Sequence, residues 1–123
     1  MTRARVLVAD DHPEVLKAIC RLLAVDFEVV GSVSDGDTVL DVAQRLKPDV
    51  IVLDLNLAHV NGLEACRQII EDNPQTKVIV FTAMNDPDVR QRSFEVGASA
   101  FVSKIASDGD LLATVKRLVS TGA

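Results

Sequence analysis

Apolar residues gather in five short runs along the chain. Each run is rich in β-branched side chains, and successive runs begin roughly 22 to 27 residues apart. Such runs are typical of strands. The predicted strands are Arg5–Ala9, Phe27–Gly31, Val50–Leu53, Lys77–Phe81 and Ala100–Ser103. The third and fourth runs are apolar at consecutive positions, which favours central strands covered on both faces.

Helical periodicity fills the gaps between these runs. The predicted helices are Pro13–Ala24, Asp37–Leu46, Asn61–Asp72, Pro87–Val96 and Asp108–Ser120. All but Pro87–Val96 carry the apolar stripe of a helix that lies on a sheet. We expect Pro87–Val96, which is poor in apolar residues, to pack loosely and to be largely exposed. The alternation predicts an α/β fold, a doubly wound (βα)5 unit with helices on both faces of a five-stranded parallel sheet.

Composition fits one globular domain over residues 1–123, since 48% of the residues are hydrophobic and 25% are charged. No apolar run approaches the roughly 18 residues of a membrane span. The first apolar stretch is also too short for a signal peptide. We therefore expect a cytoplasmic protein that does not bind membranes.

The net charge of −5 argues against direct nucleic-acid binding, which needs clustered basic residues. Cys20 and Cys66 fall in phase with apolar neighbours, which favours buried, inert thiols over a disulfide or a metal site. His12 and His59 have no visible partners in the sequence. We interpret both as surface residues.

Polar side chains follow four of the predicted strands. They are Asp10 and Asp11 after the first strand, Asp54 after the third, Thr82 after the fourth and Lys104 after the fifth. The carboxyl ends of parallel strands meet in one crevice of an open α/β sheet. The sequence therefore predicts a site with three carboxylates, one hydroxyl and one ammonium group.

Three neighbouring carboxylates repel one another. Two charges about 4 Å apart cost roughly 4 kcal/mol at an effective dielectric constant near 20. Either one carboxylate stays protonated or a cation sits among them. Oxygen ligands in a partly hydrated site suit Mg²⁺. A metal ion, an ammonium and a hydroxyl together could hold a phosphoryl group.

Each of these residues also has an ordinary explanation. Asp11 could be a helix N-cap, with Glu14 completing a capping box and Pro13 in the first turn. That interpretation leaves Asp10 unexplained. Taken alone, Asp54 could open a polar loop, Thr82 is a common strand residue, Lys104 could be a surface charge and Phe101 could belong to the core. Their joint placement at strand ends favours a functional site.

Four motifs resemble those of response-regulator receiver domains from two-component phosphorelay systems. They are DDHP after the first strand, LDLNLAHVNGLEA after the third, FTA after the fourth and FVSK at the fifth. The resemblance covers nearly the whole chain and implies the flavodoxin-like strand order 2-1-3-4-5. DDHP and a Lys104 that no proline follows are most similar to the NarL/FixJ (LuxR-type) subfamily.

The resemblance implies a role for each site residue. Asp54 resembles the phosphoacceptor, which takes its phosphoryl group from a sensor histidine kinase or a phosphotransfer protein. Asp10 and Asp11 resemble the Mg²⁺ acids, Asp11 as a direct ligand and Asp10 partly through water. The backbone carbonyl of Asn56 corresponds to a further metal ligand.

The remaining roles concern the response to phosphorylation. Thr82 resembles the switch hydroxyl, Lys104 the ammonium that pairs with the phosphoryl group, and Phe101 the switch aromatic. Ala83 is small, as an open approach to Asp54 requires. The face formed by the last two helices and the strand between them is expected to repack. Such a domain signals and catalyses only its own phosphorylation and dephosphorylation.

Three positions depart from the usual family pattern. Leu57-Ala58 stands where Met-Pro is usual, so we expect a less rigid loop, with Asn61-Gly62 supplying the turn. Ile105 follows Lys104 where many receivers have a cis proline, so we expect a trans peptide and a shifted loop. Met84, at the rim, could shield the acyl phosphate from water.

Regulators of the NarL/FixJ type carry a helix-turn-helix DNA-binding domain after the receiver. The sequence, which stops at Ala123, is therefore either a stand-alone receiver or the excised N-terminal part of a longer regulator of transcription. The analogy favours excision. Formation of a homodimer is left open.

Three other functions fit the sequence less well. A haloacid-dehalogenase-type phosphatase would need its nucleophilic Asp after the first strand and an acid two residues later. Here Asp54 follows the third strand, and the residue two positions later is Asn56. A flavin-binding module would place phosphate at the first loop, where Asp10 and Asp11 would repel it. A degenerate receiver is disfavoured because all five site positions are filled.

Overall fold

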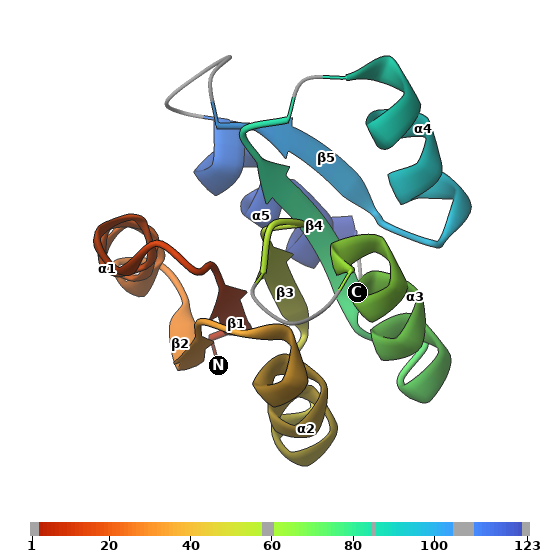
Figure 1. Cartoon of the computed structure of the whole chain (residues 1–123). Helices are drawn as coiled ribbons and strands as arrows, with labels where there is room; N and C mark the ends of the chain where they lie inside the picture. The colour runs from red at the N-terminus through yellow and green to blue at the C-terminus, as the bar shows by residue number, and fades with distance from the viewer. Residues whose placement is uncertain (1–2, 58–60, 85, 105–109, 122–123) are drawn as a thin grey trace.

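Parallel strands and helices alternate along the chain in a computed structural model that describes residues 3–57, 61–84, 86–104 and 110–121. Within these residues the strands are β1 (Arg5–Ala9), β2 (Glu28–Val33), β3 (Val50–Leu53), β4 (Lys77–Thr82) and β5 (Ala100–Ser103). The helices are α1 (Pro13–Ala24), α2 (Gly36–Leu46), α3 (Gly62–Asp72), α4 (Pro87–Glu95) and α5 (Asp110–Thr121). The sheet order is β2-β1-β3-β4-β5, which confirms the predicted fold (Figure 1).

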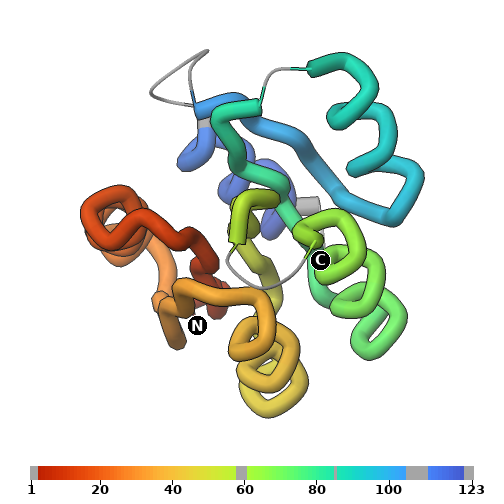
Figure 2. The backbone as a smooth tube through the Cα atoms, viewed as in Figure 1, coloured from red at the N-terminus to blue at the C-terminus, as the bar shows by residue number. Residues whose placement is uncertain are grey.

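The sheet is the middle layer of three. Helices α1 and α5 lie on one face, and α2, α3 and α4 lie on the other (Figures 1 and 2). Successive strand residues point to opposite faces. Val6 and Val8 therefore pack with α1 and α5, whereas Leu7 packs with α2 and α3. Burial on both faces explains why the central strands are apolar at consecutive positions.

Side-chain caps begin three of the helices. Asp35, Asn61 and Asp86 accept backbone N–H groups at the starts of α2, α3 and α4. Asn61 is thus the cap of α3 and not its first helical residue. The capping role considered for Asp11 is wrong, because His12 occupies the N-cap position of α1 and makes no side-chain cap hydrogen bond. Pro13 begins that helix instead, with its fixed φ angle.

Strand β2 extends two residues further than predicted. A register shift opposite Val6 and Leu7 lets β2 continue to Val33, which pairs with Ala9. The main chain of β2 therefore reaches the carboxyl end of β1, where the acidic residues begin.

Helix α4 is weakly anchored, as predicted. All nine of its residues are described, and only Ser93 is buried among them. The Phe94 side chain is 42% exposed. Cys66 is fully buried, as expected, but Cys20 is only half-buried, and both are free thiols. The expectations for Ala58, His59 and the Lys104–Ile105 peptide lie outside the described residues.

Candidate functional site

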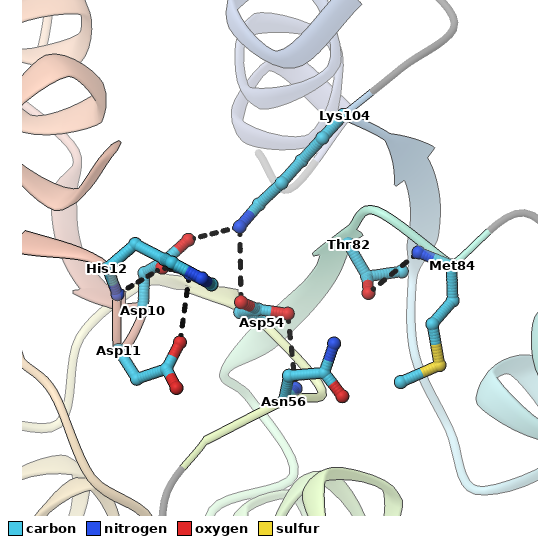
Figure 3. Close-up of polar contacts among 8 residues, drawn as sticks. All are labelled: Asp10, Asp11, His12, Asp54, Asn56, Thr82, Met84 and Lys104. Atoms are coloured by element: carbon cyan, nitrogen blue, oxygen red, sulfur yellow. Dashed lines mark hydrogen bonds and ion pairs between the residues drawn. The ribbon is translucent and has the colours of Figure 1, made fainter. Parts of the chain in front are cut away.

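Backbone hydrogen bonds between neighbouring strands continue past the strand ends and fix the site residues. The N–H of Asp10 donates to the Val33 carbonyl (3.0 Å), and that of Asp54 to the Ala9 carbonyl (2.9 Å). The N–H of Lys104 donates to the carbonyl of Thr82, 2.8 Å away. Asp10, Asp54 and Lys104 are therefore held at one edge of the sheet, as the sequence predicted (Figure 3).

Lys104 bridges two buried carboxylates. Its Nζ donates to Asp10 Oδ2 at 2.5 Å and to Asp54 Oδ2 at 3.1 Å, and the two residues are 1% and 2% exposed. Burial alone would lower the pKa of Lys104, but the hydrogen bonds to Asp10 and Asp54 outweigh it and raise that pKa. Lys104 therefore stays a cation at neutral pH, in contact with both acids.

The turn after β3 orients Asp54. Asp54 Oδ1 accepts the backbone N–H of Asn56 at 3.1 Å. Leu55 and Leu57, on either side of Asn56, are both buried and pack into the core. Apolar side chains thus anchor the described part of this loop. The expectation that the loop is less rigid than one with Met-Pro stays a prediction.

Gly62 holds the start of α3 against the same turn. A Cβ atom at this position would lie 2.4 Å from the Cα and the carbonyl oxygen of Leu55. Real Cβ atoms do not approach a backbone so closely, so the packing requires glycine. The close approach couples α3 to the residue that directly follows Asp54.

Asp11 supplies a buried oxygen without a hydrogen bond. Among the described residues, nothing donates a hydrogen bond to Asp11 Oδ1, although the His12 Nδ1 atom lies 3.0 Å away. A buried polar atom normally has a partner, because leaving it unpaired is costly. This oxygen is therefore available to a cation.

His12 belongs to the site, and the expectation that it lacks partners is wrong. The His12 side chain is 63% exposed, yet its Nδ1 lies 3.2 Å from Asp10 Oδ1. Its backbone N–H also donates to Asp10 Oδ1, at 2.9 Å. Because α1 begins at Pro13, His12 is the last extended residue and its ring folds back toward the acids (Figure 3). The adjacency of His to Asp-Asp in the sequence was the available signal.

These groups converge as metal ligands do. Asp10, Asp11, His12 and Asp54 each offer one ligand atom, and the four atoms lie within 4.8 Å of one another. Three carboxylates face one ammonium, so the cluster keeps an excess of negative charge. Together with the buried Asp11 oxygen that accepts no hydrogen bond, this donor set fits a divalent cation.

Three further predicted residues lie at the end of β4. Thr82 is fully buried, and its Oγ1 accepts the backbone N–H of Met84 at 3.3 Å. Ala83 is exposed, and the half-buried Met84 packs against the core on the α2–α3 side. Figure 3 shows Thr82 and Met84 on the β4 side of Asp54, away from Asp10.

Phe101 is the second residue of β5, and its side chain is half-buried. The Arg90 guanidinium of α4 stands over the Phe101 ring at 5.7 Å and over the Phe94 ring at 5.6 Å. A cation stacked on two rings in this way links α4 to β5.

Comparisons with known proteins agree with this geometry. The family described as "Response regulator receiver domain" matches residues 6–116. The transcriptional regulatory protein DegU of Brevibacillus brevis is 32% identical over 98% of this chain and 51% of its own length. The chain spans about half the length of the curated relatives it matches.

Solved structures give the same result. The BeF3-activated receiver domain of DrrB from Thermotoga maritima has a TM-score of 0.87 and 32% identity, covering 98% of this chain and 99% of that one. A LuxR-family response regulator from Aurantimonas sp. SI85-9A1 has a TM-score of 0.92 and 27% identity, covering 98% of this chain and 87% of that one. DegU and the LuxR-family regulator are of the NarL/FixJ type, which confirms the predicted subfamily resemblance, whereas DrrB is an OmpR/PhoB homologue.

Proposed function

The chain belongs to the response regulator receiver domain family, and from this membership we propose that Asp54 accepts a phosphoryl group from a sensor histidine kinase. A receiver domain implies a cognate histidine kinase, and such a domain signals instead of turning over a substrate. The observation that carries the proposal for this chain is the Asp54 carboxylate, buried and held by Lys104 and by the N–H of Asn56.

In the proposed reaction an Asp54 carboxylate oxygen forms a bond to phosphorus as the P–N bond of phosphohistidine breaks. The electron pair of that bond stays on the imidazole nitrogen, which later takes a proton from water. Lys104 already touches Asp54, so a fixed positive charge stands where the charge of the phosphoryl group arrives. Hydrolysis of the acyl phosphate by water restores the Asp54 carboxylate.

We propose that Asp10, Asp11, Asp54 and the backbone carbonyl of Asn56 hold Mg²⁺. The ion would neutralise charge on the carboxylates and polarise the transferred phosphoryl group. The Asp11 Oδ1 atom is buried and accepts no hydrogen bond, which favours Asp11 as a direct ligand. Asp10, which already binds Lys104 and the His12 N–H, is better suited to contact through water.

We propose that phosphorylation changes the packing of the face formed by α4, β5 and α5. The Thr82 hydroxyl accepts the Met84 N–H and can turn its own proton toward a phosphoryl oxygen on Asp54. Movement of Thr82 would free space for Phe101, whose ring is stacked under Arg90 of the weakly anchored α4. The face would then repack to control an output.

Several further proposals follow from the relatives. We propose that the receiver regulates transcription through a helix-turn-helix domain in a longer regulator, since the relatives are about twice as long. None of the described helices is long and apolar enough to cross a membrane. We also propose a cytoplasmic location for this regulator.

Met84 is proposed to limit the access of water to the acyl phosphate from the rim. Its side chain is half-buried beside Thr82. Replacing Met84 by Asn or Glu should then speed dephosphorylation, and an unchanged rate would remove this role.

Incubation with acetyl phosphate and Mg²⁺, followed by intact-protein mass, tests the phosphoacceptor proposal. We expect one phosphoryl adduct on the wild type, and none after removal of Mg²⁺ with a chelator or on Asp54→Asn. Asp11→Asn should stay folded but lose the Mg²⁺-dependent adduct. An equal adduct on Asp54→Asn, or none on the wild type, would refute the proposal.

A further inference from the structure

The imidazole of His12 lies at the spacing of a metal ligand from the two acids of the proposed Mg²⁺ site. Adjacent ligands about 2.1 Å from an octahedral ion lie about 3.0 Å apart. His12 Nδ1 is 3.0 Å from Asp11 Oδ1 and 3.2 Å from Asp10 Oδ1. The sequence predicted an oxygen-only site, whereas the structure adds a nitrogen donor.

We propose that His12 makes this a mixed oxygen and nitrogen site that binds late first-row divalent metals, such as Ni²⁺ and Zn²⁺, in competition with Mg²⁺. Imidazole suits these metals, and their affinity for nitrogen-containing sites rises along the series toward copper. Mg²⁺ prefers oxygen ligands and keeps several waters, so it gains little from the ring. The inference rests on the metal site of the proposed function.

The remaining geometry supports a ligand role for this particular nitrogen. Asp11 Oδ1 is buried without a hydrogen bond, and Nδ1 is the ring atom that faces it. The backbone of His12 is fixed by its N–H bond to Asp10, so the ring is tethered beside the acids even though it is exposed. Exposure leaves room for the waters that would complete a coordination shell.

A hydrogen bond is the competing explanation of the same contact. A protonated Nδ1 could donate to Asp10 Oδ1 at 3.2 Å or pair with Asp11 Oδ1 at 3.0 Å. In that arrangement Nδ1 carries a proton and does not bind the metal. The two explanations therefore differ in the fate of the Nδ1 proton when metal is added.

Isothermal titration with Ni²⁺ and with Mg²⁺ tests the proposal on the wild type and on His12→Asn. We expect the wild type to bind Ni²⁺ at least about tenfold more tightly than Mg²⁺. His12→Asn should lose about tenfold or more in Ni²⁺ affinity and much less in Mg²⁺ affinity. His59→Asn is the matched control and should change neither affinity, and Asp11→Asn should weaken both.

Nitrogen NMR of the His12 ring gives a second test. A purely structural role of His12 would leave the Nδ1 chemical shift unchanged when metal is added. Addition of Zn²⁺ should shift the Nδ1 resonance and leave the proton on Nε2. Equal losses for Ni²⁺ and Mg²⁺ in His12→Asn, no loss for either, or an Nδ1 that keeps its proton with Zn²⁺ present would overturn the inference. Failure of the phosphoacceptor proposal is detected separately, in the wild-type adduct formed with Mg²⁺ alone.

Discussion

Lys104 holds together a cluster of groups that would otherwise repel. Its ammonium contacts Asp10 and Asp54, which are both almost fully buried, and its own side chain is 15% exposed. These two ion pairs stabilise the unphosphorylated protein, because they neutralise part of the negative charge at the edge of the sheet. They also prepare the site for the proposed reaction. Removing the ammonium would leave both carboxylates buried and without their cation.

Replacing Lys104 by Met should therefore lower the free energy of unfolding by about 3–5 kcal/mol in the absence of divalent metal. Mg²⁺ should restore part of this loss, because it binds the same carboxylates. Urea denaturation with and without Mg²⁺ measures both effects. Lys116→Met is the control, because Lys116 pairs with Asp26 on the exposed surface (3.4 Å) and should cost less than about 1 kcal/mol. Equal losses in the two variants would contradict the role given to Lys104.

Cys66 makes stability depend on pH above neutrality. Burial raises the pKa of its thiol from an ordinary 9.0 to about 12. The pKa of this thiol is higher in the folded than in the unfolded state, so its contribution to the free energy of unfolding is fully present below pH 9.0. That contribution is lost as the pH rises toward 12, because the thiol of the unfolded chain ionises first.

The free energy of unfolding should thus fall with rising pH above pH 9.0, with a slope that approaches about 1.4 kcal/mol per pH unit from this thiol. Cys66→Ala should be less stable at neutral pH, because of the cavity, but should show a shallower slope. Urea denaturation below pH 10.5, where Lys104 does not yet contribute, separates the two groups. Identical slopes in wild type and variant would refute the assignment.

At the scale of elements, α3 and the turn after β3 are packed backbone against backbone. Gly62 permits this contact, and the carboxylate of Asp54 depends on the same turn through the N–H of Asn56. The position of the phosphoacceptor is therefore tied to the start of a helix.

Gly62→Ala should lower stability by about 1–3 kcal/mol and also slow phosphorylation by acetyl phosphate, because the added Cβ displaces Leu55. Gly31→Ala is the matched control. There the new Cβ would lie 3.2 Å from Leu7 Cδ1 and 3.4 Å from Leu46 Cδ1, which are the ends of side chains and not backbone atoms. If Gly31→Ala slowed phosphorylation as much as Gly62→Ala, the effect would reflect stability and not the turn.

Helix α4 depends on Arg90 for part of its attachment to β5. Exposed cation–π contacts contribute about 0.5–1 kcal/mol each. Arg90→Ala should therefore accelerate hydrogen exchange of the α4 amides several-fold and leave those of α1 unchanged. Arg92→Ala, an exposed residue of the same helix, is the control. Unchanged exchange in Arg90→Ala would show that the stacking does not restrain α4.

At the scale of the whole molecule, periodicity was enough to predict the layers, because each strand and helix carries its own pattern. The acidic and basic site residues were predictable for the same reason, since parallel strands bring their carboxyl ends together. Three features escaped prediction. The extension of β2 to Val33 depends on pairing with the distant strand β1. The fold of the His12 ring toward two acids and the approach of Gly62 to Leu55 depend on local turn geometry, which hydrophobic periodicity does not report.

The capping pattern of Asp11 shows how a local signal can mislead. Asp11, Pro13 and Glu14 fit a capping box in the sequence, but α1 begins at Pro13 with His12 at the cap position. Asp11 lies one residue before the cap position, and its buried oxygen accepts no backbone N–H of the helix. Because Pro13 is the first residue of α1, His12 and not Asp11 occupies the N-cap position.

Locating the phosphoryl group on the chain is the most direct test of the central claim. After treatment with acetyl phosphate and Mg²⁺, borohydride would reduce an acyl phosphate to an alcohol, which peptide mass spectrometry can assign to one residue. We expect homoserine at position 54 and unmodified aspartate at positions 10 and 11. Homoserine at position 10 or 11, or at no position, would contradict the assignment of Asp54 as the phosphoacceptor.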